Sequence, residues 1–414
     1  MIKRSILLFC MVIFLTSPVS AQASERPRYI VRFAATLSAD TSIASVTIRV
    51  TKNADWVNWM LLRIDPTRYR EFKGSGNIET RNGDIYWAPP DSNAWLSFDV
   101  DLLSKRSNGR YDGYRGDDWL LFRLDDLVPQ IRIDMKDGTE SYSTLELDLP
   151  ENWSAALPYK QFRNGRYSLD NQRSLFDRPS GWMLTGESLG IRREVIAETA
   201  VTVAAPTGQN FARMQALSFL YRNLPSIRTL LPMFPDRLLI VGADDPMWRG
   251  ALSGPRSLFL HSDRPLISED STSTLIHELI HVGMQARGEA DADWLVEGLA
   301  EYYALSLLAR SGDLPDTRIE AAFSALAKSA DHARPLTSGR SYGRITARAV
   351  TKLRAIDREI REGSSGKFSL DDVVRELALR DARVSNLAFA ELVETFAGHP
   401  SATLARILSE SVEP

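Results

Sequence analysis

Apolar and polar residues alternate along the chain from about Arg28 to Trp153. Successive side chains of a strand point to opposite faces, so this period of two predicts strands that each bury one face. Turn-forming sequences such as Asn82-Gly83 separate several of the alternating runs. These features predict an all-β region, built as a sandwich. Half-buried strands are expected at 29–33, 45–50 and 95–100, and further strands at 119–122, 130–134 and 143–149.

Tryptophans are frequent in this region, and two roles are open to them. They can line a groove for a ligand, or they can fill the core between two sheets. Aromatic residues at strand spacing usually belong to the core, so we expect them there. The residues are Trp56, Trp59, Trp87, Trp95 and Trp119.

The pattern changes after the alternating region. Residues 157–190 are rich in Asn, Arg, Gly, Ser and Pro, which predicts a long connection. A helix is expected over 212–224, among strands expected at 199–205, 237–241 and 257–260. From Ser271 onward the apolar residues recur with a helical period, which predicts helices over 272–286, 293–310, 316–329, 341–362, 369–380, 386–397 and 402–411.

This order of elements predicts three domains and the fold class α+β. The chain of 414 residues is longer than one hydrophobic core usually organises. We expect a signal peptide at 1–23, a β-sandwich at 24–180, an α+β domain with a mixed sheet at 181–312 and a helical C-terminal domain at 313–414.

The N-terminal segment has the three parts of a secretory signal peptide. Lys3-Arg4 is a basic start, Ile6–Leu15 is an uninterrupted apolar run, and small residues follow. Cleavage is expected after Ala21 or Ala23. The alternative is an uncleaved membrane anchor, which needs about 20 apolar residues to cross the hydrocarbon layer. We therefore expect a protein exported to the periplasm or secreted, without a stable membrane anchor.

Composition narrows the class of protein only a little further. The chain is 44% hydrophobic and 25% charged, which is ordinary for a soluble globular protein. A formal net charge of −3 gives no electrostatic reason to expect nucleic acid as a partner. The single cysteine, Cys10, lies in the predicted signal peptide, so the mature chain is expected to have no disulfide.

The helix expected over 272–286 contains the motif His-Glu-Leu-Ile-His, from His277 to His281. Residues four apart lie one above the other on a helix, about 6 Å along its axis. Two imidazoles at that spacing can bind one Zn²⁺, and Glu278 beside the first imidazole can reach a water on the metal. The residues around the motif are apolar, as expected of a helix that crosses a core.

A catalytic zinc site needs a third protein ligand and an open position. The next expected helix offers Glu297 within the apolar run Trp-Leu-Val-Glu-Gly-Leu-Ala. Gly288 ends the first helix, and so short a connection makes the two helices antiparallel, which returns Glu297 toward the histidines. Glu301 lies one turn further along the same face and can accept the free ring N–H of a histidine ligand. A carboxylate in so apolar a run needs a partner, which favours a ligand over a solvated helix face.

The sequence around these residues resembles a known group of enzymes. HELIH and WLVEGLAEYY are similar to the two-helix signature of the gluzincin metallopeptidases. The chain resembles the glycyl aminopeptidase family most closely, and the alanyl aminopeptidase family more distantly. Three further segments carry the resemblance, namely Ser174–Gly181, Ser341–Arg344 and Phe368–Leu377. The resemblance implies a thermolysin-like catalytic domain between the β-sandwich and the helical domain.

The resemblance also implies roles for single residues. Glu278 is the general base, and the ligands of one Zn²⁺ per chain are His277, His281 and Glu297. Tyr342 is the donor that stabilises the oxyanion, with a packing role as its alternative. The residues alone leave two readings of Arg344, which either binds a substrate carboxylate or belongs to the solvated face of an arginine-rich helix.

One segment departs from the family pattern. In these families, a glycine-rich strand before the zinc helix carries a Glu that holds the free amino group of the substrate. The matching stretch here includes Gly250, and Ser253 stands in the place of that Glu. A hydroxyl cannot pair with an ammonium group as a carboxylate does. This departure argues against aminopeptidase specificity, but not against hydrolysis of peptide bonds.

These observations together predict a zinc-dependent metallopeptidase that acts on a peptide or protein. One alternative is a non-catalytic binding or scaffold protein that keeps zinc for stability. A structural zinc site fills its fourth position, however, and has no use for a base such as Glu278. A second alternative is a zinc hydrolase that acts on another amide or on an ester.

Overall fold

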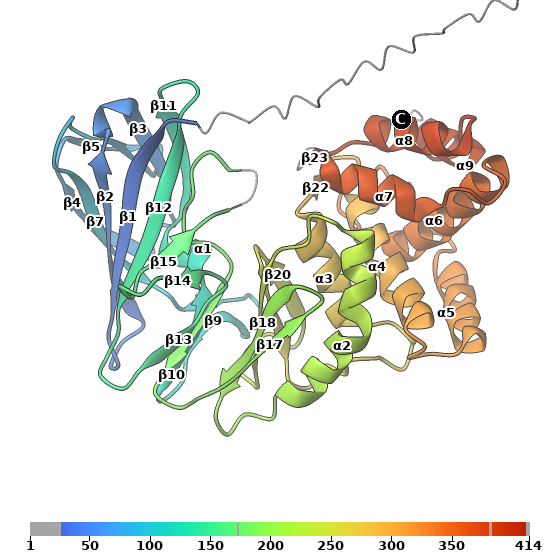
Figure 1. The fold of residues 1–414 in the computed structure, drawn as a ribbon, viewed down its shortest axis with the longest axis horizontal. Helices are drawn as coiled ribbons and strands as arrows, with labels where there is room; N and C mark the ends of the chain where they lie inside the picture. Colours follow the sequence, from blue (N-terminus) through green and yellow to red (C-terminus); the bar gives the residue numbers. More distant parts are fainter. Residues whose placement is uncertain (1–25, 172–173, 381–382, 411–414) are drawn as a thin grey trace, which may run out of the picture.

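The computed structural model describes residues 26–171, 174–380 and 383–410. The predicted signal peptide, 1–23, lies outside these residues. Strands fill the N-terminal side of the molecule and helices the C-terminal side, with a mixed sheet between them (Figure 1). The combination of several sheets with packed helices confirms the predicted α+β class.

The largest sheet of the N-terminal part has the strand order β14-β15-β12-β1-β2-β7-β4. Neighbouring strands are antiparallel, except for the parallel pair of β1 and β12. Its strands are β1 (Arg28–Leu37), β2 (Ile43–Lys52), β4 (Tyr69–Gly74), β7 (Ala94–Asp101), β12 (Glu140–Asp148), β14 (Lys160–Gln161) and β15 (Tyr167–Leu169).

Two smaller sheets complete this part of the molecule. One has the order β11-β3-β6-β5, and the other has the order β13-β16-β10-β9-β8. Buried side chains from all three sheets, such as Phe33, Trp87 and Leu120, share one core. The bounds are β3 (Val57–Arg63), β5 (Asn77–Arg81), β6 (Asp84–Ala88), β8 (Ser104–Lys105), β9 (Tyr111–Arg115), β10 (Trp119–Arg123), β11 (Gln130–Met135), β13 (Ser154–Ala156) and β16 (Trp182–Gly186), with short helices η1 (Ala54–Trp56) and α1 (Leu124–Leu127).

The sequence pattern predicts most strands of this region correctly. At the end of the region, the amino-acid composition leads to a wrong prediction. All six predicted runs coincide with or overlap a strand. Of the tryptophans, Trp87 and Trp119 are buried, whereas the other three are partly exposed. The prediction of a long connection over 157–190 is wrong, because this stretch contains β14, β15, β16 and the start of β17. These strands are formed by pairing with distant partners, such as β16 with β10, which their own composition does not reveal.

The mixed sheet follows, with the order β17-β18-β19-β21-β20. Strands β18, β19 and β21 are parallel, and the edge strands β17 and β20 are antiparallel to their neighbours. The N-terminal part packs on one face through Leu121 and Trp182, which contact the cluster of Leu239 and Phe259. The strands are β17 (Leu189–Ile196), β18 (Thr199–Pro206), β19 (Arg237–Ala243), β20 (Ala251–Gly254) and β21 (Ser257–His261).

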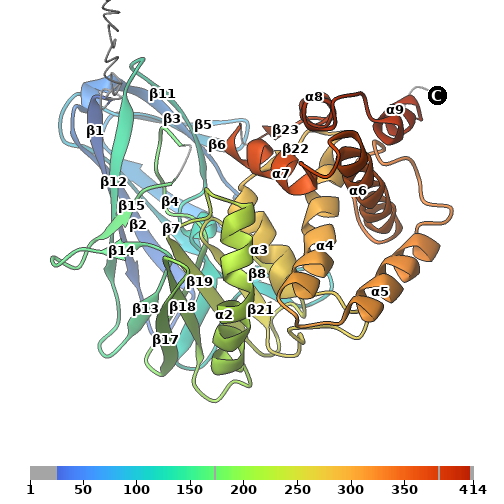
Figure 2. The ribbon, with the colours of Figure 1, turned by 45° about the vertical axis from the view of Figure 1, so that its right-hand side comes forward.

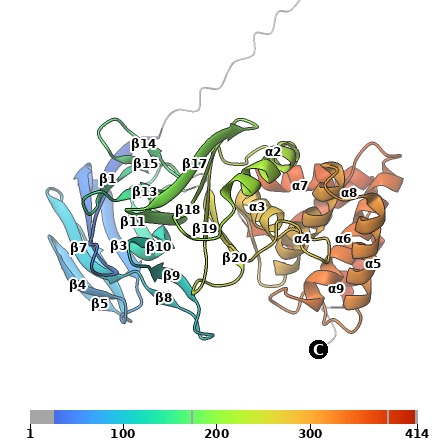
Figure 3. The same ribbon diagram turned by 90° about the horizontal axis from the view of Figure 1, so that it is seen from below.

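Three helices lie between the mixed sheet and the C-terminal helices (Figure 3): α2 and α3 pack on the opposite face of the sheet, and α4 packs on α2 and α3. They are α2 (Arg213–Leu230), α3 (Thr274–Met284) and α4 (Asp293–Arg310). Their apolar sides join the sheet in one continuous core, which includes Leu220, Ile240, Leu279 and Leu299. This core holds α3 and α4 against each other, and α3 lies beside the edge strand β20.

The C-terminal part consists of helices packed on the outer side of α4 (Figure 2). A parallel pair of two-residue strands joins this part to the connection between α3 and α4. No helix among the described residues is long and apolar enough to cross a membrane. The elements are α5 (Asp316–Ser329), α6 (Arg344–Gly363), α7 (Leu370–Leu379), α8 (Asn386–Ala397) and α9 (Ala402–Ser409), with the strand pair β22 (Arg287–Gly288) and β23 (Arg383–Val384).

Candidate metal centre

Helix α3 presents two histidines on one face. Its first turn is capped by Ser273, whose Oγ accepts a hydrogen bond from the N–H of Ile276 at 3.3 Å. Such a cap satisfies an amide group that the first turn leaves without a partner. The apolar residues between and beside the histidines are buried, whereas His277 and His281 keep partial exposure. The helix therefore buries its apolar sides and turns its imidazoles toward open space.

The start of α4 is fixed by a residue from the C-terminal part. The indole N–H of Trp294, which is fully buried, donates to Asn386 Oδ1 at 3.0 Å. Asn386 Nδ2 donates in turn to the carbonyl of Asp291 at 3.1 Å. These two bonds hold the first turn of α4, which leads directly to Glu297. The position of the third predicted ligand thus depends on contacts with a helix far along the chain.

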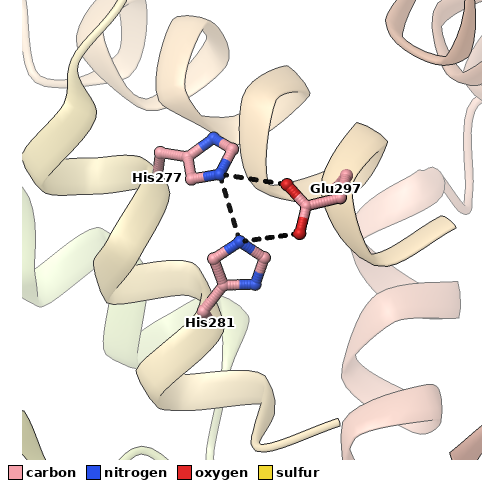
Figure 4. Close-up of side chains that lie close together, drawn as sticks. All are labelled: His277, His281 and Glu297. Carbon is pink, nitrogen blue, oxygen red and sulfur yellow. Dashed lines mark hydrogen bonds and ion pairs between the residues drawn. The ribbon is translucent and has the colours of Figure 1, made fainter. Parts of the chain in front are cut away.

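The three predicted ligands converge on one point (Figure 4). The Nε2 atoms of His277 and His281 are 3.1 Å apart. Glu297 Oε2 lies 3.5 Å from Nε2 of His277, and its Oε1 lies 3.6 Å from Nε2 of His281. In a tetrahedral zinc site with bonds of about 2.0–2.1 Å, ligand atoms are separated by about 3.3 Å. The donor atoms therefore have the type and the spacing that zinc requires.

Glu301 fixes the orientation of the first histidine. Its Oε2 lies 2.9 Å from Nδ1 of His277. A carboxylate only accepts hydrogen bonds, so Nδ1 donates to Glu301, and Nε2 is the ring atom that faces the other predicted ligands and is left for a metal. This is the orientation that a metal ligand needs, and the role of Glu301 beside a bound metal stays a prediction.

The charges around the histidines favour a cation between them. Burial acts to lower the pKa of His277, but hydrogen bonds with Glu297 and Glu301 outweigh it and raise this pKa to about 10. Burial and the charge on His277 lower the pKa of His281. Burial opposes ionisation of Glu297, yet the two histidines hold the pKa of its carboxyl below the usual range. The cluster thus holds a proton strongly when no metal is bound, and a divalent cation competes for that place.

Glu278 lies beside the cluster and is held by the edge strand. Its side chain is buried, and its Oε2 accepts a hydrogen bond from the backbone N–H of Ser253 at 2.7 Å. Ser253 belongs to β20, so this bond joins α3 to the edge of the mixed sheet. The contact uses the backbone of Ser253 and leaves its hydroxyl out.

These residues open into a cleft of about 750 Å³. We call the side formed by α3 and α4 the helical wall, which includes His277, Glu278, His281, Asp293 and Glu297. We call the side formed by β10, β20 and the turn after β20 the strand wall, which includes Arg123, Ser253 and Arg256. The cleft brings all three predicted ligands and Glu278 together with Ser253.

Three other predicted site residues lie elsewhere. Gly250 is buried under the ring of Trp248 and does not line the cleft. Tyr342 is 66% exposed, and neither it nor Arg344 is among the described residues that line the cleft. The segment is nevertheless tied to the rim, because the N–H of its neighbour Ser341 donates to Asp293 Oδ2 at 2.7 Å.

Sequence reasoning missed several residues that shape this site. Arg123 and Arg287 line the cleft, and Asn386 holds the start of α4. Arg123 ends a strand in the N-terminal part and carries no motif. Asn386 follows Ser385, whose Oγ caps α8, and the sequence gives no sign of the second role. Only the apolar run 119–122, which predicts a strand there, was available as a signal, and it does not show what the strand end faces.

The fold is shared with solved structures, among them one of an M1 zinc metallopeptidase. An aminopeptidase N family protein from Idiomarina loihiensis aligns with a TM-score of 0.65 at 14% identity, over 84% of this chain and 70% of that chain. An M1 zinc metallopeptidase from Deinococcus radiodurans aligns with a TM-score of 0.60 at 16% identity, over 94% of this chain and 95% of that chain. Yeast LTA4 hydrolase in complex with bestatin gives 0.54 at 15% identity, over 93% and 66%.

The sequence itself matches no protein-family model, and it matches no curated protein at a significant level. The similarity therefore lies in the three-dimensional structure. The chain has the fold of the M1 zinc metallopeptidases.

Proposed function

We propose that this chain is an exported zinc-dependent metallopeptidase of the gluzincin type that hydrolyses peptide bonds. The observation that carries the proposal is the convergence of His277, His281 and Glu297, with Glu278 beside them in an open cleft. A site that served stability alone would close its fourth position and would need no buried carboxylate next to it. The glycyl aminopeptidase family stays the predicted subgroup.

The residues of the chain divide the work of hydrolysis. A zinc ion bound here would lower the pKa of a coordinated water toward about 7 and polarise the carbonyl of the substrate. Glu278 accepts the proton of the attacking water and can pass it to the leaving amine. The N–H of Ser253 holds the carboxylate of Glu278 in position at 2.7 Å. Glu301 orients His277 through its Nδ1 atom.

Tyr342 is proposed as the donor to the oxyanion, on the resemblance of its motif alone. Its phenol is exposed and lies outside the lining of the cleft, so this role requires the segment to rearrange when substrate binds. Ser341, held by Asp293, provides the fixed end of such a movement. A Tyr342→Phe variant with unchanged kcat would remove this part of the proposal.

Export is proposed from the N-terminal sequence. The protein recovered from the periplasm or medium is expected to begin at Gln22 or Ser24, which mass spectrometry of the intact chain measures. Recovery of residues 1–23 on membrane-bound protein would contradict this part.

A digest of a peptide library tests the function directly. The zinc-loaded protein is expected to cut peptides, and removal of zinc with a chelator is expected to stop cleavage until zinc is restored. Zinc-loaded Glu278→Gln protein is the control that excludes a contaminating peptidase. If esters or other amides are cleaved and peptides are not, the alternative of another zinc hydrolase holds. If the protein binds zinc and no substrate is cleaved, the alternative of a zinc-containing binding protein holds.

A further inference from the structure

The cleft continues past the proposed metal ligands toward residues of opposite charge. The acidic groups that line it, Glu278, Asp293 and Glu297, all belong to the helical wall. Three arginines line the rest of the cleft, namely Arg123, Arg256 and Arg287. A substrate that lies across the proposed zinc site therefore meets positive charge outside it.

The positive charge of Arg123 is only weakly paired with a carboxylate. Among the described residues, its guanidinium makes one hydrogen bond, a 3.5 Å contact with Asp125 Oδ2. Asp125 is engaged more closely by others, because its carboxylate accepts from Arg178 and from the N–H of Gly181, each at 2.9 Å. The guanidinium also lies over the ring of Trp182, 5.7 Å from its centroid. A guanidinium has five N–H donors, so most of those of Arg123 are available to a ligand.

Trp182 places Arg123 near the strand that contacts Glu278. The indole N–H of Trp182 donates to the carbonyl of Leu252 at 2.8 Å, and the next residue along β20 is Ser253. Arg123 therefore lies over a ring that is bonded to the stretch of β20 beside Glu278. A group of the substrate held by Arg123 would belong to a residue close to the scissile bond.

Arg287 lies in the connection between α3 and α4 and lines the cleft from there. It follows the end of α3, and its side chain is exposed. Within the part of the chain that the structure describes, this side chain makes no hydrogen bond or ion pair. Its charge is thus free to interact with a ligand in the cleft.

Arg256 is different from these two. Its side chain is 7% exposed, and its Nη1 forms an ion pair with Asp170 at 2.8 Å and lies 4.0 Å from Asp236. The positive charge of a buried arginine that is paired with carboxylates is already balanced by these neighbours. It serves to fix the turn after β20 and leaves Arg123 and Arg287 as the available cations.

We propose that the cleft selects peptides with a carboxylate next to the scissile bond, and that Arg123 and Arg287 bind this carboxylate. The inference rests on the proposed function and names the substrate class of the same site. Guanidinium groups bind carboxylates through two parallel hydrogen bonds, which gives both affinity and orientation. The carboxylate is either an Asp or Glu side chain or the C-terminus of a short peptide. A free ammonium group at the same place is repelled.

Binding to inactive protein tests the inference without requiring cleavage. Zinc-loaded, full-length Glu278→Gln protein is titrated by calorimetry with four versions of one short acetylated peptide. Two versions differ in a C-terminal carboxylate or amide, and two differ in a Glu or Gln at one internal position. We expect at least one carboxylate version to bind about tenfold more tightly than its amide, because a hydrogen bond to a charged group contributes about 1.4 kcal/mol or more. The pair that shows the difference identifies the source of the carboxylate.

Variants then assign the effect to the two arginines. The Arg123→Gln and Arg287→Gln changes, made together, are expected to bring the affinity ratio close to one while zinc content stays the same. Arg383→Gln is the matched control, because Arg383 is exposed and pairs through its backbone with Arg287 but does not line the cleft. It is expected to leave the ratio unchanged.

The outcomes separate this inference from the proposed function. Equal binding of all four peptides, or a preference that survives the double change, overturns the role of the arginines. A carboxylate preference in Glu278→Gln protein, combined with no cleavage by the wild type, supports the arginine site and refutes the peptidase. Cleavage by the wild type without any carboxylate preference supports the peptidase and refutes the arginine site.

Discussion

The two walls of the cleft carry different chemistry and are built in different ways. The helical wall holds His277 and His281 at a spacing set within one helix, and it adds Glu297 from the next helix. The strand wall touches the proposed site through a backbone group, the N–H of Ser253, and its charged side chains are arginines. The helical wall has the groups proposed to bind metal and to move protons, whereas the strand wall has groups proposed to position other residues or a substrate.

We infer from this difference that one wall serves catalysis and the other serves the choice of substrate. A change in the helical wall acts on metal binding or on the chemical step. A change in the strand wall acts on which substrate is held, or on the stability of the wall, and leaves the metal in place. Each of the following predictions tests one side of this division.

The largest effect is expected for Glu278→Gln. The amide cannot take up a proton, so kcat is expected to fall by at least roughly 10²–10⁴-fold while zinc stays bound. Steady-state kinetics and metal analysis of the same preparation measure both quantities. Ser253→Ala is the control, because it keeps the backbone N–H that holds Glu278 and is expected to keep most of the activity. Wild-type turnover by the Glu278→Gln protein would refute the assignment of the base.

A smaller effect is expected for Glu301→Ala. The change removes the carboxylate that lies 2.9 Å from Nδ1 of His277, so the imidazole is no longer held in one orientation. Loss of such a partner typically weakens metal binding or activity by about 10–100-fold. Competition with a chelator of known affinity measures the change in zinc affinity. Glu320→Ala, which removes a surface ion pair with Arg354, should leave zinc affinity unaltered. Equal zinc affinity of the two variants would contradict the role of Glu301.

Asp177 offers a test of stability behind the strand wall. It accepts a hydrogen bond from the N–H of Asn171, which lines the cleft, and burial raises its pKa from 3.8 to about 7. Because the folded state holds this proton more tightly than the unfolded state, stability falls as pH rises from about 4 to 7. Asp177→Asn is therefore expected to stabilise the protein above pH 7, on the order of a few kcal/mol at most, and much less below pH 4.

Urea unfolding of both proteins at high and low pH, with zinc bound, measures this difference. Catalytic activity is expected to stay close to that of the wild type. A variant that is destabilised equally at both pH values would show that the ionised carboxylate contributes a needed interaction.

The smallest effect is expected for the amino terminus of the substrate. With Ser253 in place of a carboxylate, acetylated and free versions of the same peptide are expected to be cut at similar rates, and internal bonds are expected to be cut. Ser253→Glu is expected to favour free amino termini by about tenfold, the size of one charge-assisted hydrogen bond. Paired digests read by mass spectrometry give the ratio. Release of single residues from free N-termini alone, by the wild-type protein, would contradict the prediction.

The contrast between the walls also explains what could be predicted from sequence. The spacing within α3 places two proposed ligands, and the short connection to α4 returns Glu297, so local rules were sufficient to predict these three residues. Asn386, which holds the start of α4 from a distant helix, was not predicted. Helices α4, α5 and α8 even have the predicted bounds. The strand wall depends on pairing between β10 and β16 and on the contact of Trp182 with Leu252, which no local pattern encodes. Arg123 could not be placed for that reason.

We propose above all that His277, His281 and Glu297 together hold one zinc ion. Metal analysis after saturation with zinc and dialysis tests it most directly, on the wild type, Glu278→Gln and His281→Ala proteins in parallel. We expect about one zinc per chain in the first two and none in His281→Ala, because two remaining ligands cannot hold the ion against dialysis. If the wild-type protein retains no zinc, or the His281→Ala protein retains one zinc per chain, these residues do not form the zinc site.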